Sequence, residues 1–177
     1  MAAVELTTSR LLLRQWRDDD LERWAELNAD PEVRRYFGTV LDREQSAAAL
    51  ERFRAELELR GWGWWAVELR SERRFLGFAG LDPVDEEMPF DGVEAGWRLH
   101  RDAWGHGYAT EAGRAVLRYG FEELGLPEIL AVIAEDNAPS RAVAGRLGMA
   151  HDPAADFLDP SVPTGPGRHA VVYRLRG

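Results

Sequence analysis

Cysteine and lysine are both absent from the 177 residues of this chain, and all 22 basic residues are arginine. Without cysteine there is no disulfide framework, no thiolate zinc site and no cysteine nucleophile. No apolar stretch approaches the roughly 18 residues of a membrane span, and the first residues lack the basic start and apolar run of a signal peptide. We therefore expect a cytoplasmic protein that holds no metal.

The charge balance is acidic, with 31 acidic residues against 22 basic ones and a net charge of −9. An acidic chain disfavours nucleic acid and anionic membranes as main partners, because both bind to basic surfaces. It suits a cationic or amine-bearing ligand better. The length and a hydrophobic content of 45% are those of an ordinary globular chain, and we expect one domain over residues 1–177.

The periodicity of apolar residues switches repeatedly between strand and helix. Helices are expected after Asp18, Asp30 and Asp42, over 109–124, and after Asn137. Strands are expected at 11–16, 62–69, 75–81, 93–100, 129–134 and 170–175. This order indicates an α/β (α+β) fold with a mixed sheet.

Two irregular places interrupt this pattern. Gly96 lies inside the 93–100 strand, where a glycine marks a bulge or a close approach to the backbone. The proline-rich stretch 152–168 is expected to be a long loop, of the kind that is usually functional or mobile.

The segment 102–111, DAWGHGYATE, joins a strand to a long helix and has two glycines at the helix entrance. Glycines there let the chain turn tightly and expose successive N–H groups beside a helix N-terminus, which favours a pyrophosphate. Two other interpretations stay open. Gly105–Thr110 half matches a dinucleotide-binding fingerprint, and the glycines could also form a purely structural turn.

The combination of Trp104–Ala112, Asn137–Ser140 and Leu147–Gly148 resembles the GNAT superfamily of acetyl-CoA-dependent N-acetyltransferases. Thr8–Arg14 and Asp30–Val33 are similar to its branch of ribosomal-protein N-terminal acetyltransferases. The chain departs from the superfamily pattern at Asp102, where Arg or Gln is usual. The resemblance implies a mixed, mostly antiparallel central sheet flanked by helices, with acetyl-CoA as cosubstrate.

The resemblance also implies a set of cofactor-binding residues. The pantetheine arm would pair with the backbone of Trp97, Arg98 and Leu99, where the 93–100 and 129–134 strands splay apart. The pyrophosphate would lie on the amides of Gly105, His106, Gly107, Tyr108 and Ala109. The His106 side chain would face the phosphates or, equally, solvent.

Further cofactor contacts are implied for the last helix. Asn137 is expected both to cap this helix by accepting from the Ser140 N–H and to contact the pantetheine. Arg146, with Arg141, is a candidate for the 3′-phosphate, although both could lie on an ordinary solvated helix face.

Acetyl transfer to an amine needs a neutral nucleophile, whereas α-amino groups have a pKa near 8 and lysine near 10.4. A carboxylate base therefore helps, as does a hydrogen bond to the departing thiolate. We expect Glu94, just before Gly96, to be the base and Ser140 to stabilise the thiolate, with no covalent acyl-enzyme. Glu94 could instead be a plain strand-edge carboxylate.

The expected acceptor is a primary amine, either a protein N-terminus or a small molecule, chosen by the first two helices and the 152–168 loop. Two alternative functions stay open: a CoA-binding module without turnover that engages a protein partner, and an NAD-binding enzyme. A homodimer is compatible with the sequence.

Overall fold

A computed structural model describes residues 3–177 of the chain. Its sheet has nine strands in the order β1-β2-β3-β4-β5-β6-β9-β7, and β8 also pairs with β9. All pairings are antiparallel except β5 with β6, so the expected mixed, mostly antiparallel sheet is confirmed. The strands are β1 Leu6–Thr7, β2 Leu11–Arg14, β3 Trp64–Leu69, β4 Arg74–Pro83, β5 Val93–Leu99, β6 Glu128–Ala134, β7 Ala150–His151, β8 Phe157–Leu158 and β9 His169–Arg176.

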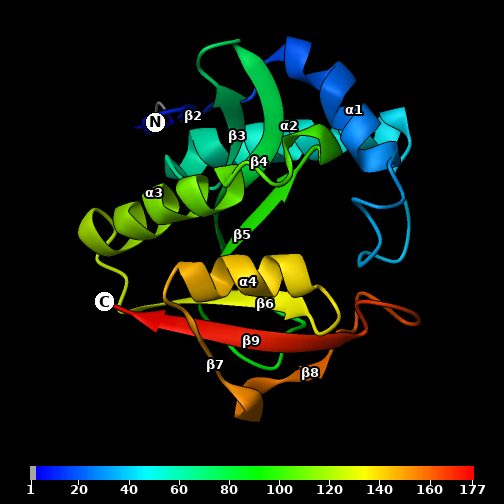
Figure 1. The fold of residues 1–177 in the computed structure, drawn as a ribbon, viewed down its shortest axis with the longest axis vertical. Helices are drawn as coiled ribbons and strands as arrows, with labels where there is room; N and C mark the ends of the chain where they lie inside the picture. Colours follow the sequence, from blue (N-terminus) through cyan, green and yellow to red (C-terminus); the bar gives the residue numbers. More distant parts are fainter. Residues whose placement is uncertain (1–2) are drawn as a thin grey trace.

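Helices cover both faces of the sheet (Figure 1). On one face, Phe78 of β4 packs against two helix residues, Trp24 of α1 and Phe53 of α2. Their ring centroids lie 5.9 and 5.6 Å from that of Phe78. On the other, Gly120 of a long helix packs over Leu81. The helices are α1 Leu21–Ala29, α2 Arg43–Arg60, α3 Tyr108–Glu122 and α4 Ala138–Arg146, with 3₁₀ turns at Asp18–Asp20, Arg101–Ala103 and Pro153–Ala155.

The cap residues read from the sequence set the ends of two helices. The Asp42 carboxylate accepts from the Gln45 N–H, and the Gln45 side-chain oxygen accepts from the Asp42 N–H. The helix α2 therefore begins with a complete capping box. Gly61 ends α2 in the left-handed conformation at φ 79°. Asn137 caps α4 by accepting from the Ser140 N–H at 3.2 Å, as expected.

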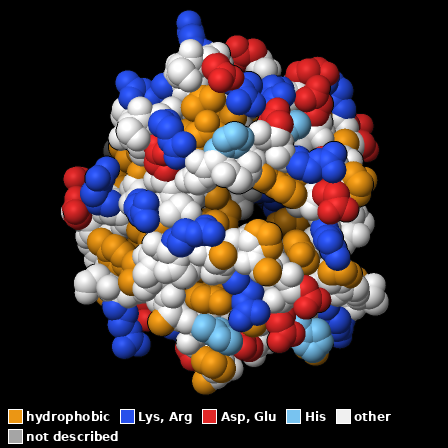
Figure 2. All heavy atoms as spheres, viewed as in Figure 1, with side chains coloured by type: hydrophobic (Ala, Val, Ile, Leu, Met, Phe, Trp, Pro, Cys, Tyr) orange, Lys and Arg blue, Asp and Glu red, His pale blue; other side chains and the backbone are white. Residues whose placement is uncertain are grey.

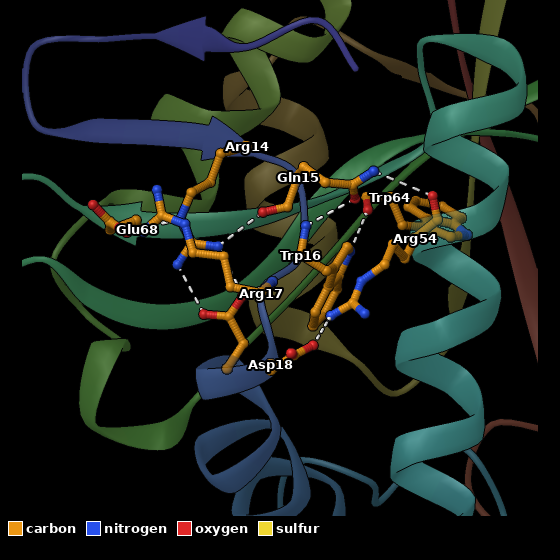
Figure 3. A network of polar contacts seen from close by, with 9 residues as sticks. Arg14, Gln15, Trp16, Arg17, Asp18, Arg54, Trp64 and Glu68 are labelled. Carbon is orange, nitrogen blue, oxygen red and sulfur yellow. Dashed lines mark hydrogen bonds and ion pairs between the residues drawn. The ribbon is translucent and has the colours of Figure 1, made fainter. Parts of the chain in front are cut away.

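Buried polar contacts fix the link between β2 and α1 to the sheet (Figure 3). The guanidinium of Arg14 is almost fully buried and pairs with Asp20 and Glu68, both at 2.7 Å. Trp16 donates its indole N–H to the Trp64 carbonyl at 2.8 Å. These contacts hold the entrance of α1 against β3, and with it the face of the sheet that α1 and α2 cover.

The helix expected after Asp30 does not form. A single turn closes from the Arg34 N–H to the Asp30 carbonyl and is not continued. Val33 is the only buried residue between 31 and 39, so a helix there would have no apolar face to bury. This segment, 31–39, instead links α1 to α2 through turns and bends.

Two other expectations need correction. Gly96 is not at a bulge, because β4 and β5 pair without a register shift, and the irregularity lies at Val67/Glu68 on β3. Gly96 does mark a close approach: a Cβ there would lie 2.9 Å from the ring of Trp64. The stretch 152–168 is only partly loop, since a 3₁₀ turn and β8 lie within it and β8 pairs with β9. Within residues 3–177, no helix is long and apolar enough to cross a membrane.

Candidate active site

The sheet opens between β5 and β6. The two strands run parallel and form one register pair, Glu94 with Leu130, and no further pair follows. Figure 1 shows β5 running diagonally away from β6, and Figure 2 shows a deep hollow near the centre of the same view. The expected splaying of these strands is confirmed. A chain with its own amide groups fits along the β5 edge that this parting exposes.

That exposed edge belongs to the residues expected to hold the pantetheine. The backbone of Trp97 and Leu99 pairs with Ala79 and Gly77 on β4. The opposite backbone edge of this part of β5 faces the opening toward β6. The Leu99 carbonyl accepts from the Trp104 indole N–H at 2.9 Å, so part of this edge is already used. The Arg98 side chain lies on the sheet face covered by α1 and α2, where its guanidinium stacks on Phe78.

The turn into α3 presents unused amide groups. Gly105 and Gly107 both have φ 78°, and Gly107 is the N-cap of α3. Within residues 3–177, no hydrogen bond takes the amides of residues 105–109. Free amides beside a positive helix end make an anion site. The His106 ring stacks on Tyr108 with centroids 5.3 Å apart, and His106 itself is exposed.

Two residues that the sequence reasoning missed brace this turn. Glu111 on α3 accepts from the Thr8 hydroxyl at 2.6 Å, and its carboxylate pairs with Arg10 at 2.7 Å. Arg10 also donates to the His106 carbonyl at 3.0 Å and stacks on Tyr108, which puts a cation beside the free amides. Burial alone would raise the pKa of Glu111, but the hydrogen bonds from Thr8, Arg10 and Ser9 hold it below its ordinary value.

This bracing also explains why two distant sequence motifs occur together. The Thr8–Arg14 motif supplies the donors and the 104–112 motif supplies the acceptor, Glu111. Asp102, where the superfamily pattern has Arg or Gln, faces elsewhere: its carboxylate pairs with Arg23 at 2.9 Å and Arg74 at 3.3 Å. It therefore ties the strand end to α1 and β4.

The start of α4 faces the opening from the β6 side. Ser140 is half-buried, and its hydroxyl has no hydrogen-bond partner within residues 3–177. Arg141 donates to the Tyr173 hydroxyl at 3.1 Å and to the Glu135 carbonyl at 3.0 Å, so its guanidinium is already engaged. Arg146 is exposed at the far end of α4, with no ion pair to any described residue.

Glu94 lies where β5 and β6 part, directly opposite Asp82 on β4. Burial, and then the negative charges of Asp82, Asp159 and Asp85, raises the pKa of Glu94 to about 7. Asp82 itself is held by Arg60 at 2.7 Å and by the Trp64 indole N–H at 3.2 Å. Glu94 can therefore both take and give a proton near neutral pH, which is what proton transfer at this pH requires.

The 152–168 stretch contacts segments that are far away in the sequence. Asp159 comes from the 152–168 stretch, and its negative charge helps to raise the pKa of Glu94. In the same stretch Gly167 abuts the Tyr36 backbone of segment 31–39 so closely that a Cβ at Gly167 would clash with it. The Tyr36 hydroxyl in turn donates to the Asp136 carbonyl, just before α4, at 3.2 Å. These contacts tie the 152–168 stretch and segment 31–39 to the end of β6.

A sheet that parts beside free helix amides offers an edge for an extended ligand and a site for its anionic group. The family model of the acetyltransferase (GNAT) domain matches residues 10–150. YkkB of Bacillus subtilis is 33% identical over 84% of this chain and 86% of its own length. The uncharacterized N-acetyltransferase YoaA of the same organism is 30% identical over 81% of each chain.

A solved structure agrees with these relatives. The GNAT-family acetyltransferase from Bacillus anthracis superposes with a TM-score of 0.82, at 25% identity and over 98% of each chain. The chain belongs to the GNAT acetyltransferases and is an acetyl-CoA-dependent N-acetyltransferase. The comparisons do not favour the CoA-binding module without turnover or the NAD-binding enzyme.

Proposed function

We propose that the chain transfers the acetyl group directly from acetyl-CoA to a primary amine, with Glu94 as the general base. The observation that carries this is Glu94 itself, a carboxylate with a pKa of about 7 at the parting of β5 and β6. Glu94 takes a proton from the acceptor ammonium and passes it to solvent, and the neutral nitrogen attacks the thioester carbonyl. The C–S bond then breaks and the surplus proton on nitrogen goes to the leaving sulfur, so that the products are the N-acetylated amine and the CoA thiol. A base is needed because alkyl ammonium groups are almost fully protonated at neutral pH.

In this proposal acetyl-CoA lies along the opening in a single orientation. The free amides of Gly105–Ala109 bind the pyrophosphate, with Arg10 beside them adding positive charge. The β5 edge at Trp97–Leu99 pairs with the amides of the pantetheine arm, and Asn137 contacts the arm from the other side. Arg146, which is exposed and has no acidic partner among the described residues, contacts the 3′-phosphate in this proposal.

Ser140 acts at the sulfur end. Its hydroxyl is half-buried and unpartnered among the described residues, so it is able to donate a hydrogen bond to the thiolate that leaves. Such a bond stabilises the negative charge that develops on sulfur. Because the chain has no cysteine, transfer occurs without an acyl-cysteine intermediate.

For the acceptor we propose a protein N-terminus or a small-molecule amine. The fold resembles both kinds of enzyme: a ribosomal L7/L12 α-N-protein acetyltransferase, RimL (TM-score 0.76, 14% identity), and a Vibrio cholerae spermidine N-acetyltransferase bound to CoA and spermine (0.74, 16%). The similarity of Thr8–Arg14 to the N-terminal acetyltransferase branch favours the first kind.

The test is CoA release from acetyl-CoA in the presence of amines, followed with a thiol reagent. The assay has no protein background because the chain has no thiol. The panel contains short peptides with free N-termini, spermidine and small amino acids. Release of CoA that depends on the amine supports the proposal. Tight acetyl-CoA binding in calorimetry without release for any amine would instead indicate a binding module.

A further inference from the structure

Among the described residues, Arg98 has no counter-ion. Its guanidinium carbon lies 3.9 Å from the ring centroid of Phe37 and 5.2 Å from that of Phe78. Its Nε is buried and has no hydrogen-bond partner in the part of the chain that the structure describes. Within residues 3–177, no carboxylate lies within ion-pair distance of it. By contrast, the buried Arg14 is paired with Asp20 and the half-buried Arg60 with Asp82.

Arg34 adds a second cation to the same ring. Its guanidinium carbon lies 5.1 Å from the Phe37 centroid, and its Nε donates to the Thr39 carbonyl at 2.8 Å. No described carboxylate pairs with it either. Burial, and then the charge of Arg34, lowers the pKa of Arg98 to about 9. Two like charges next to each other in a partly desolvated place are unfavourable unless an anion joins them.

These cations lie on the same side of the sheet as Glu94. Side chains alternate along a strand, so Glu94, Gly96 and Arg98 share one face of β5. The Cα atoms of Glu94 and Arg98 are about 13 Å apart at the usual rise per residue. The stretch between them thus has an acidic end, formed by Glu94 with Asp82, and a basic end formed by Arg98 with Arg34.

We infer that the acceptor carries a carboxylate several bonds away from the reacting amine, and that Arg98, with Arg34, binds this carboxylate. This inference rests on the proposed function, because it takes Glu94 as the group that meets the amine. The guanidinium fork of arginine matches a carboxylate in geometry and charge. Both an acidic residue near the N-terminus of a peptide and a small ω-amino acid have this chemistry. A polyamine lacks it.

The test compares acceptors that differ only in the carboxylate. One pair is 6-aminohexanoate and 6-aminohexanamide; the other is the amidated peptides Ser-Ala-Glu-Ala and Ser-Ala-Gln-Ala. For each pair, kcat/KM is measured from CoA release. We expect kcat/KM for the acid to exceed that for the amide about ten- to hundred-fold in at least one pair. This is the usual contribution of a hydrogen bond to a charged group. The pair that shows the preference separates a peptide acceptor from a small-molecule one.

Variants then assign the preference to Arg98. Arg98→Met keeps much of the apolar stem and should remove the preference of acid over amide, while Arg98→Lys should restore part of it. Arg34→Gln should reduce the preference, and it keeps the test open if the Arg98 variants fail to fold. Arg118→Gln is the matched control, because Arg118 is exposed on α3, and it should leave the ratio unchanged.

Two results contradict this account at different levels. Equal kcat/KM for acid and amide in both pairs, or an undiminished preference in Arg98→Met, overturns the inference and leaves the proposed function standing. Absence of CoA release with every amine, including spermidine, overturns the proposed function and the inference with it.

Discussion

The raised pKa of Glu94 predicts opposite effects of Glu94→Gln on activity and on stability. In the unfolded chain the carboxyl ionises near 4.5, and in the folded chain near 7. Between these values the folded state holds a proton that the unfolded state has lost, so stability falls as the pH rises. Above pH 7 the loss of folding free energy caused by ionising Glu94 in the folded state has reached its full size. At about 1.4 kcal/mol per pKa unit, it amounts to about 3 kcal/mol.

Glutamine keeps the shape of the side chain and removes the charge. Glu94→Gln should therefore raise Tm at pH 8 by about 6–12 °C, the rise that about 3 kcal/mol gives for a chain of this size. The gain should shrink to nearly nothing below pH 5. Differential scanning calorimetry at several pH values measures it, with the exposed Glu122→Gln on α3 as the control.

Activity should change in the other direction. In the native chain, kcat/KM for the acceptor should rise with pH, and this limb of the pH profile should have its midpoint near pH 7. In Glu94→Gln that limb should vanish, and kcat/KM at pH 8 should fall by about 10²- to 10⁴-fold, the usual contribution of a general base. A limb that persists near pH 7 in the variant would refute the role of Glu94. An unchanged Tm at pH 8 would refute the electrostatic reasoning.

Other variants test the remaining parts of the account. Gly107→Ala should raise the KM for acetyl-CoA in steady-state assays. Gly125→Ala, at a positive φ of 64° against 78° for Gly107 but outside the site, should cost a similar 1–2 kcal/mol of stability and leave KM unchanged. Ser140→Ala should lower kcat by about ten- to hundred-fold in the CoA-release assay, with little effect on KM for the acceptor. Arg14→Met should cost about 3–5 kcal/mol in urea unfolding, because it leaves the buried Asp20 without its cation and Glu68 with Arg17 alone. A normal KM in Gly107→Ala, a normal kcat in Ser140→Ala or native stability in Arg14→Met would each contradict the corresponding step.

Much of the fold could be predicted from local patterns. Strand and helix periodicity located β3 to β6, β9, α2 and α3, and the capping residues Asp42 and Asn137 determined where two helices begin. The helix expected after Asp30 shows where this reasoning fails. A start signal is present there, but only Val33 is buried in segment 31–39, and burial of an apolar face is what sustains a short helix.

The site was predictable only where the backbone forms it. The glycines of segment 102–111 pointed to free amides at the start of α3, and the amides of residues 105–109 are indeed unused within the described chain. Contacts between distant segments left no local signal. Arg10 reaches Glu111 across about a hundred residues of sequence, and Arg98 meets Phe37 from another part of the fold. The one usable hint was that the motifs at Thr8–Arg14 and 104–112 occur together.

The most direct test of the central claim is a crystal structure of the chain with CoA. The account predicts the pyrophosphate on the amides of Gly105–Ala109, the pantetheine arm along the β5 edge at Trp97–Leu99, and the sulfur between Glu94 and the Ser140 hydroxyl. A CoA molecule that binds elsewhere, or whose sulfur lies beyond the reach of both side chains, would contradict it.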